Sequence, residues 1–135
     1  MSDVPPNIQE FNTIAGLVLA QLYKAFPADA KIDREAIAGA MGAEDWNKHK
    51  LPSGRLLDQM FKDTFNWLDR EGYIKTENSV AFVAALTSKG RSEMNAIGVE
   101  LIKAVDQAPP SGVNPSAIGD LIGGMIGGLT KSMGS

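Results

Sequence analysis

Cysteine is absent from this sequence, and histidine occurs once. Without cysteine the chain has no disulfide, no thiolate metal ligand and no cysteine nucleophile, which fits a reducing compartment. The single histidine, His49, has no second histidine at a metal-ligand spacing, so no metal site is expected. No serine lies in a nucleophile elbow, and no phosphate-binding or dinucleotide-binding glycine motif occurs. The sequence therefore indicates a protein that has no catalytic residues and uses no cofactor.

Long apolar runs and an excess of basic residues are missing as well. Residues Met1–Pro6 lack the basic region and apolar run of a signal peptide. The segment 14–22 is too short to cross a bilayer. The formal net charge is -3, whereas a domain that binds phosphates usually carries a basic excess. We therefore expect a cytoplasmic protein whose overall charge disfavours nucleic acid and whose sequence disfavours membrane insertion.

Apolar periodicity predicts three helices in the first half of the chain. The first spans residues 7–26, with an apolar stripe at Ile8, Phe11, Ile14, Val18, Leu22 and Phe26. The second follows Asp33 as its N-cap and stops at Gly42. The third runs from about Ser53 to Arg70, and Gly72 closes it through a positive φ. The positions of the third helix expected to face the core are Leu56, Leu57, Met60, Phe61, Phe65 and Leu68.

A β-hairpin and a fourth helix are predicted next. The β-prone runs 73–76 and 80–83 flank the turn formers 77–79. Thr87 is placed to cap the fourth helix, whose inward positions are Met94, Ile97, Leu101 and Ile102.

The second strand of this hairpin is apolar on both of its faces. We expect Val80, Phe82, Ala84 and Leu86 to face the core. The alternating residues Ala81, Val83 and Ala85 would then face outward. A strand that is apolar on both faces is usually covered on both. Either another segment covers the outer face, or small side chains are tolerated there.

Two segments carry a resemblance to a known family. They are "LDREGYIKT", residues 68–76, and "LTSKGRSEM", residues 86–94. Together they resemble the winged-helix superfamily, in particular an uncharacterised bacterial member, over about residues 8–104. The resemblance implies a mainly α fold with a small β-hairpin, in the order helix, helix, helix, hairpin, helix. An unrelated small α+β domain is the alternative.

The resemblance also directs attention to the third helix, which in this family enters the major groove of DNA. The candidate nucleic-acid residues are Lys48, His49, Lys50, Arg55, Lys62 and Lys75. The exposed face of the predicted helix, however, carries three carboxylates against two cations. Glu77 stands at the tip, where DNA-binding wings usually present a cation. Because phosphate contacts depend on cations, we favour a non-catalytic interaction or regulatory module, with a DNA-binding regulator as the alternative.

The composition changes after residue 108. We predict a domain at 1–108, a Pro/Gly linker at 109–117 and a Gly-rich apolar tail at 118–135. Five glycines within residues 119–128 each cost on the order of 1 kcal/mol relative to alanine, so a helix here needs a partner. Glycines four apart let such a helix approach another backbone closely. The candidate interaction surface comprises Ala81, Val83, Ala85, Ile118, Leu121, Ile122, Met125, Ile126 and Leu129.

Three interpretations of the tail remain. It docks as a helix on its own domain or on a second copy in a homodimer, it is disordered, or it acts on membranes as part of a small effector. As a helix, residues 118–133 would span about 24 Å, which is short of the roughly 30 Å hydrocarbon core. We expect docking, with the apolar second strand of the hairpin as one partner that the tail could cover.

Overall fold

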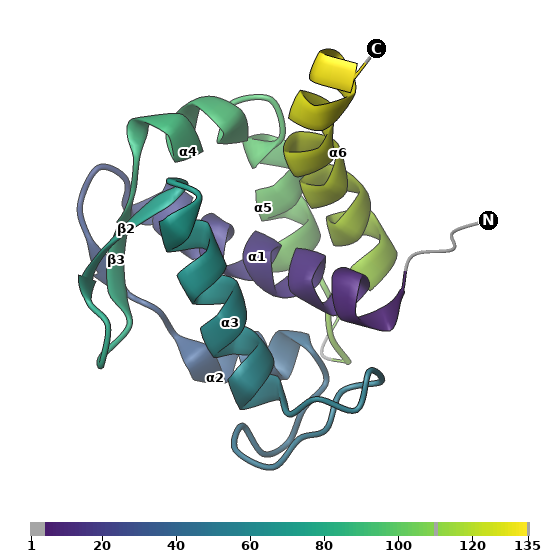
Figure 1. Ribbon diagram of the computed structural model, residues 1–135. Helices are drawn as coiled ribbons and strands as arrows, with labels where there is room; N and C mark the ends of the chain where they lie inside the picture. Colours follow the sequence, from purple (N-terminus) through teal and green to yellow (C-terminus); the bar gives the residue numbers. More distant parts are fainter. Residues whose placement is uncertain (1–4, 110, 135) are drawn as a thin grey trace.

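The computed structural model describes residues 5–109 and 111–134, with the side chains of the last helix described as far as Ile126. Its elements are α1 (Pro6–Ala25), β1 (Ala30–Lys31), α2 (Arg34–Ala40), α3 (Leu57–Arg70), β2 (Ile74–Asn78), β3 (Val83–Leu86), α4 (Ser88–Met94), α5 (Gly98–Asp106) and α6 (Pro115–Gly134). Figure 1 shows helices gathered around α1, with the small sheet at one side. The prediction of a mainly helical fold with a small β-hairpin is confirmed, and β1 adds to this hairpin a third strand that was not predicted.

Helix α1 forms the centre of the hydrophobic core. An unbroken run from Thr13 to Ala20 is buried, so neighbours cover α1 on all sides rather than along one stripe. These neighbours include α3, α5, α6 and β3. The sequence placed Ile8 in the apolar stripe of this helix. That prediction is wrong, because Ile8 lies near the start of the helix and is 44% exposed. A helix that is apolar all round is expected at the centre of a core.

The beginning of α2 is fixed by local and by distant hydrogen bonds. Asp33 Oδ1 accepts from the Ala36 amide at 3.0 Å, which confirms the predicted N-cap. The Gln21 side chain of α1 pairs with the backbone of Asp33, donating to its carbonyl and accepting from its amide. Gly42 ends this region with φ at +75°. The second helix is therefore attached to α1 through its N-cap residue.

The predicted third helix begins too early. Residues 53–56 are not helical, and α3 starts at Leu57. Residues 49–57, here called the finger, instead form a small hairpin in which Lys50 pairs with Leu56. Gly54 turns its tip with φ at +93°. Leu56 consequently points outward at 43% exposure instead of entering the core.

The sheet has the order β1-β3-β2 and is antiparallel throughout the described residues. Ile74 pairs with Leu86 across the hairpin, and Ala30 of β1 pairs with Ala84 on the other edge of β3. The predicted turn is misplaced, because residues 79–82, here called the hairpin tip, connect the strands. Val80 is therefore 87% exposed and does not face the core.

The residues predicted to face outward from the second strand are neither bare nor covered by the tail. Val83 and Ala85 of β3 are half-buried, and so is Ala81, which lies in the hairpin tip instead of the strand. The expected partner, the C-terminal tail, packs mainly on α1 and to a lesser extent on α5. Instead, the short β1 hydrogen-bonds to the free edge of β3. Because β3 has a neighbouring strand on each of its two edges, its outward-facing residues are partly shielded from solvent even where no helix covers them.

The predicted fourth helix is divided into α4 and α5 by a turn at residues 95–97. Met94 and Leu101 are buried as expected, whereas Ile97 and Ile102 are half-buried. The division lets Gly98 approach α1 so closely that a Cβ on it would lie 2.8 Å from the Tyr23 ring. Contact with α1 therefore decides where the helix is interrupted.

The segment predicted as a linker and tail is part of the same core. Val113 is buried, and its amide donates to the Ala40 carbonyl at 2.9 Å. Helix α6 starts at Pro115, three residues before the predicted boundary. Ile118, Ile122 and Met125 are buried, and Leu121 and Ile126 are half-buried. The side chain of Leu129 lies outside the described residues.

Candidate functional site

The candidate nucleic-acid residues are distributed over several elements. Lys48, His49, Lys50 and Arg55 lie on or beside the finger. Lys62 lies on α3, and Lys75 is exposed on β2. Figure 1 shows the finger and the hairpin on different sides of α3. The fold brings the finger cations together but keeps them apart from Lys75.

The cations next to α3 are largely paired within the chain. Asp58 Oδ2 binds Lys62 Nζ at 3.1 Å, and Asp58 Oδ1 lies 4.0 Å from Arg34 Nη1. The same Oδ1 accepts from Trp46 Nε1 at 3.1 Å. One carboxylate thus contacts two cations and an indole, which reduces the net positive charge that this part of α3 presents to solvent.

Other polar groups of α3 are also engaged. Gln59 Nε2 donates to Asp63 Oδ1 at 3.0 Å. Asp69 Oδ1 accepts from the Thr76 amide at 3.0 Å and so occupies a donor at the outer edge of β2. The exposed face of α3 is therefore a polar surface whose side chains are oriented by contacts inside the chain.

An aromatic cluster connects this face to the hairpin tip. The Phe82 ring lies 5.0 Å from Phe61 and 5.3 Å from Phe65, both edge to face. The Arg34 guanidinium lies 5.0 Å from the Phe82 ring and 5.5 Å from the Trp46 ring. Phe82 has φ at +57°, a conformation that costs a bulky side chain energy. Packing between Arg34 and the phenylalanine rings compensates for that cost.

The hairpin tip itself is ordered by one side chain. Asn78 Oδ1 accepts from the amides of Val80 and Ala81, both at 3.0 Å. This arrangement holds the backbone of Val80 in place, and the Val80 side chain extends into solvent. Sequence reasoning placed Val80 in the core because alternation alone cannot reveal a longer turn.

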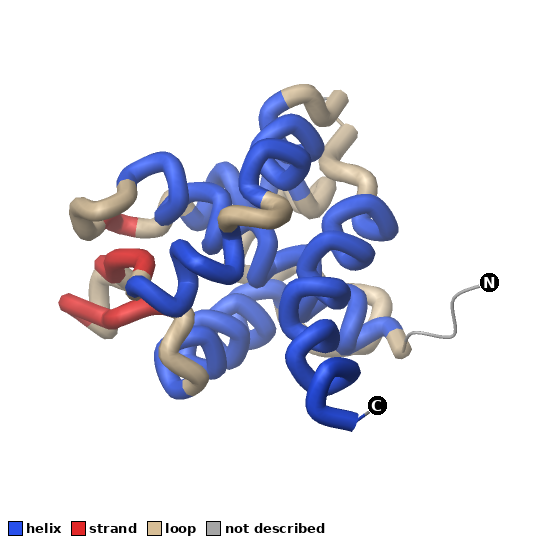
Figure 2. Tube along the Cα trace, turned by 90° about the horizontal axis from the view of Figure 1, so that it is seen from above, coloured by secondary structure: helices blue, strands red, loops and turns tan. Residues whose placement is uncertain are grey.

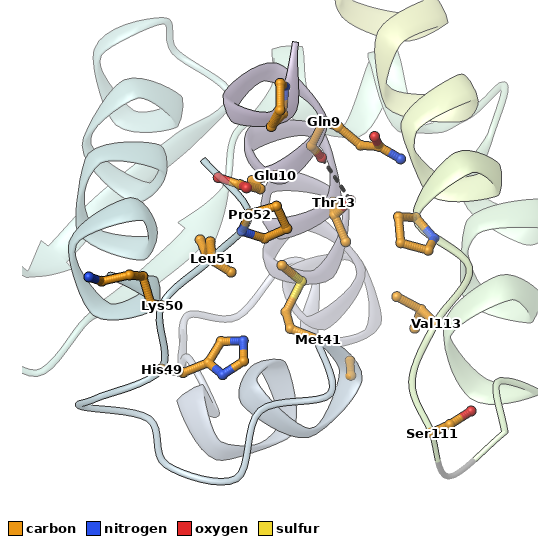
Figure 3. Close-up of a pocket in the computed structure, with 13 residues that line it drawn as sticks. Gln9, Glu10, Thr13, Met41, His49, Lys50, Leu51, Pro52, Ser111 and Val113 are labelled. Atoms are coloured by element: carbon orange, nitrogen blue, oxygen red, sulfur yellow. Dashed lines mark hydrogen bonds between the residues drawn. The ribbon is translucent and has the colours of Figure 1, made fainter. Parts of the chain in front are cut away.

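A second site was not predicted from the sequence. A cleft of about 800 Å³ lies between the finger and the segment that precedes α6. Figure 3 shows Met41, Leu51 and Val113 converging on it, with Thr13 of α1 behind them. The His49 ring borders the cleft, whereas the Lys50 side chain extends away from it. No sequence motif marks this cleft, because its walls come from four separate segments.

The floor of the cleft, formed by α1, contains a buried carboxylate. Glu10 of α1 is 5% exposed. Its Oε2 accepts from the Ser53 amide at 2.8 Å, and its Oε1 accepts from the Ser53 hydroxyl at 2.6 Å. This contact fixes the finger tip on α1. It also explains why residues 53–56 do not join α3, because Ser53 is held by Glu10 instead.

The described part of the chain contains no cluster of three or more acidic or histidine side chains able to hold a metal ion. None of the helices within it combines the length and the apolarity needed to cross a membrane. Comparison of the chain with protein-family models, with curated proteins and with solved structures found no match.

Proposed function

We propose that the chain is a non-catalytic winged-helix-like module that binds a protein partner through the outer face of α3 and the hairpin tip. The order of elements supports the winged-helix assignment, since a hairpin follows the third helix of the domain. A short β1 between α1 and α2 adds a third strand to that hairpin. Fold alone does not determine activity, so the functional part rests on the side chains.

The observation that carries the proposal is the pairing around Asp58. Lys62 and Arg34 are both within 4.0 Å of its carboxylate. A DNA-binding face needs cations that are free to contact phosphates. Protein interfaces, in contrast, have few free charges at their centre and are surrounded by satisfied polar groups. The outer face of α3 therefore has the character of a protein interface and not that of a DNA-binding face.

The hairpin tip supplies the apolar contact of the proposed interface. Val80 is 87% exposed and its backbone is held by Asn78. A loop whose backbone is already ordered loses less conformational entropy on binding than a flexible one. Glu77 next to it adds negative charge, which favours a protein surface over a phosphate backbone.

The test is site-specific photo-crosslinking in the native cells. A photoreactive residue at Val80 or Asn66, both exposed, should capture one defined protein. The same residue at Glu100 of α5 should not capture it. The captured protein is then purified and its affinity measured, and Val80→Asp should weaken binding at least about tenfold, roughly 1.4 kcal/mol. Equal capture from the α3 face and from Glu100 would contradict the proposal. A second copy of this chain as the captured protein would identify the partner as self.

The finger favours a second candidate, a DNA-binding regulator. Lys48, Lys50 and Arg55 are exposed, and none of them forms an ion pair among the described residues. Fluorescence anisotropy with random duplex DNA at physiological salt distinguishes the two functions. We expect no binding at micromolar protein. Binding that is lost in the Lys48→Glu, Lys50→Glu double variant would support the DNA-binding function instead.

A further inference from the structure

The cleft beside the finger has the size and the lining of a small-molecule site. Its volume of about 800 Å³ lies within the range that ligand pockets occupy. The floor is α1, one wall is the finger and the other is the segment 111–115. Most of the lining is apolar, and the contributors are Pro6, Ala40, Met41, Leu51, Pro52, Val113 and Pro115. This lining suits a compact apolar group.

Both walls of the cleft are held in place by hydrogen bonds. Ser53 joins the finger to Glu10 through its amide and its hydroxyl. On the other side, the Val113 amide binds the Ala40 carbonyl at 2.9 Å. Gly112, at φ +126°, passes so close to Ala40 that a Cβ there would lie 2.7 Å from its carbonyl oxygen. The cleft is therefore formed before any ligand enters.

The charge of Glu10 is not balanced by a cation of the protein. Among the described residues, no lysine, arginine or histidine nitrogen lies within 4.0 Å of its carboxylate. A carboxylate offers about four acceptor positions, and Ser53 occupies two of them. Burial of a charge is costly, and the two hydrogen bonds from Ser53 offset only part of that cost when no opposite charge is present. A cation that entered the cleft would lower this cost.

The other ionisable groups of the lining are His49 and Lys50. Lys50 is exposed and extends away from the cleft into solvent, where its charge is screened. His49 is half-buried at the border. Glu10 is the most deeply buried of the three, so its carboxylate has the strongest electrostatic effect inside the cleft.

We propose that this cleft binds a small organic cation, an amine carried on an apolar frame. The ammonium group would lie at the Glu10 carboxylate, and the frame would lie between Met41 and Val113. This site lies apart from the α3 face and the hairpin tip, so it is independent of the proposed protein-binding function.

The test is a comparison of three probes that share a phenyl group on a three-carbon chain and end in a cationic, a neutral or an anionic group. They are 3-phenylpropylamine, 3-phenylpropanol and 3-phenylpropionate, titrated into the full chain and followed by amide chemical shifts in NMR. We expect the amine to bind at least about tenfold more tightly than the alcohol, with the acid weakest. Equal affinity for amine and alcohol, tighter binding of the acid, or no binding of any probe would each overturn the proposal.

Variants show whether Glu10 and the cleft are responsible. Glu10→Gln should weaken amine binding at least about tenfold and leave the alcohol within about twofold. Glu77→Gln removes the same charge from the exposed hairpin and should change neither affinity. Ser111→Trp places an indole at the rim without altering a charge and should weaken both the amine and the alcohol. Unchanged amine affinity in Ser111→Trp would place the binding elsewhere and contradict the proposal, even if Glu10→Gln failed to fold.

Discussion

A Cβ atom on Gly16 of α1 would lie 2.6 Å from the Cγ2 methyl of Ile118 on α6. The close approach between these helices therefore depends on a glycine of α1. Within the part of α6 whose side chains are described, the tail glycines do not supply it, because Gly119 and Gly124 have open space where a side chain would start. Gly123 is close only to the Asn12 side chain, at 3.8 Å. Ile118 and Ile122 of α6 fill the space that Gly16 leaves.

Gly16→Ala should destabilise the protein by about 1–3 kcal/mol. The new methyl group overpacks a closed contact with a β-branched side chain, and this cost exceeds the gain in helix propensity. Chemical denaturation measures the change. The double variant Gly16→Ala, Ile118→Ala should be less destabilised than the sum of the two single variants, because the smaller side chain removes the clash. Strictly additive effects would show that the two residues do not compete for space.

Gly119→Ala is the matched substitution on α6. It should stabilise the protein, whereas Gly16→Ala should destabilise it. Its Cβ meets nothing within 4 Å, so only the helix propensity changes, which favours alanine by up to about 1 kcal/mol. The same denaturation experiment measures it. Destabilisation would indicate that the glycine face of α6 is occupied in solution, for example by a second copy of the chain.

Truncation after Gln107 should lower the melting temperature strongly or prevent folding. It removes Ile118, Ile122 and Met125, all buried, and burial of each such side chain contributes about 1.5–3 kcal/mol. That sum approaches the 5–15 kcal/mol typical of a whole domain. Truncation after Gly128 keeps all three side chains and serves as the control. If the chain truncated after Gln107 kept its melting temperature and its oligomeric state, packing of α6 on α1 would not contribute to stability.

Leu86→Ala should destabilise the fold by about 2–5 kcal/mol, because Leu86 is a buried residue at the end of β3. Val80→Ala in the same hairpin should change stability by no more than about 0.5 kcal/mol, since Val80 is 87% exposed. Thermal melting of the two variants side by side measures the contrast. Similar effects of both substitutions would show that the hairpin register is wrong.

Thr87→Ala should cost about 0.5–2 kcal/mol through loss of the N-cap of α4. The Thr87 hydroxyl accepts from the Gly90 amide at 3.0 Å, and its Oγ1 lies within hydrogen-bond distance of the Gly72 and Tyr73 carbonyls. Thr87→Ser retains the hydroxyl and should keep most of the stability. Urea unfolding of both variants tests this, and an equal loss in serine and alanine would attribute the effect to the methyl group.

Stability should decline above pH 10 in a way that depends on Tyr73. Burial raises the pKa of the Tyr73 phenol above its usual 10.0, and Glu93 and Glu71 raise it further. The phenol therefore ionises at a lower pH in the unfolded chain than in the folded one. Its contribution is complete below pH 10 and is lost as the pH rises through the folded pKa. Tyr73→Phe should flatten this decline in denaturation experiments, and an unchanged slope would contradict the assignment.

The sequence by itself determined the features that depend on neighbours a few residues away. Asp33 caps α2 by bonding the amide three residues ahead, and Thr87 caps α4 in the same way. Gly42 and Gly72 end their segments with positive φ, as their positions after helical patterns predict. These contacts close within one turn of chain, so they form in the same way whatever the rest of the molecule does.

Tertiary structure decided the features that join distant parts of the chain. Ser53 leaves α3 because Glu10, 43 residues earlier, binds its amide and hydroxyl. The turn at residues 95–97 divides the fourth predicted helix just before Gly98 packs against Tyr23, and β1 pairs with β3 after more than fifty intervening residues. The cleft exists only because α1, α2, the finger and the segment before α6 converge. Such contacts are set by three-dimensional packing, and local periodicity carries no information about them.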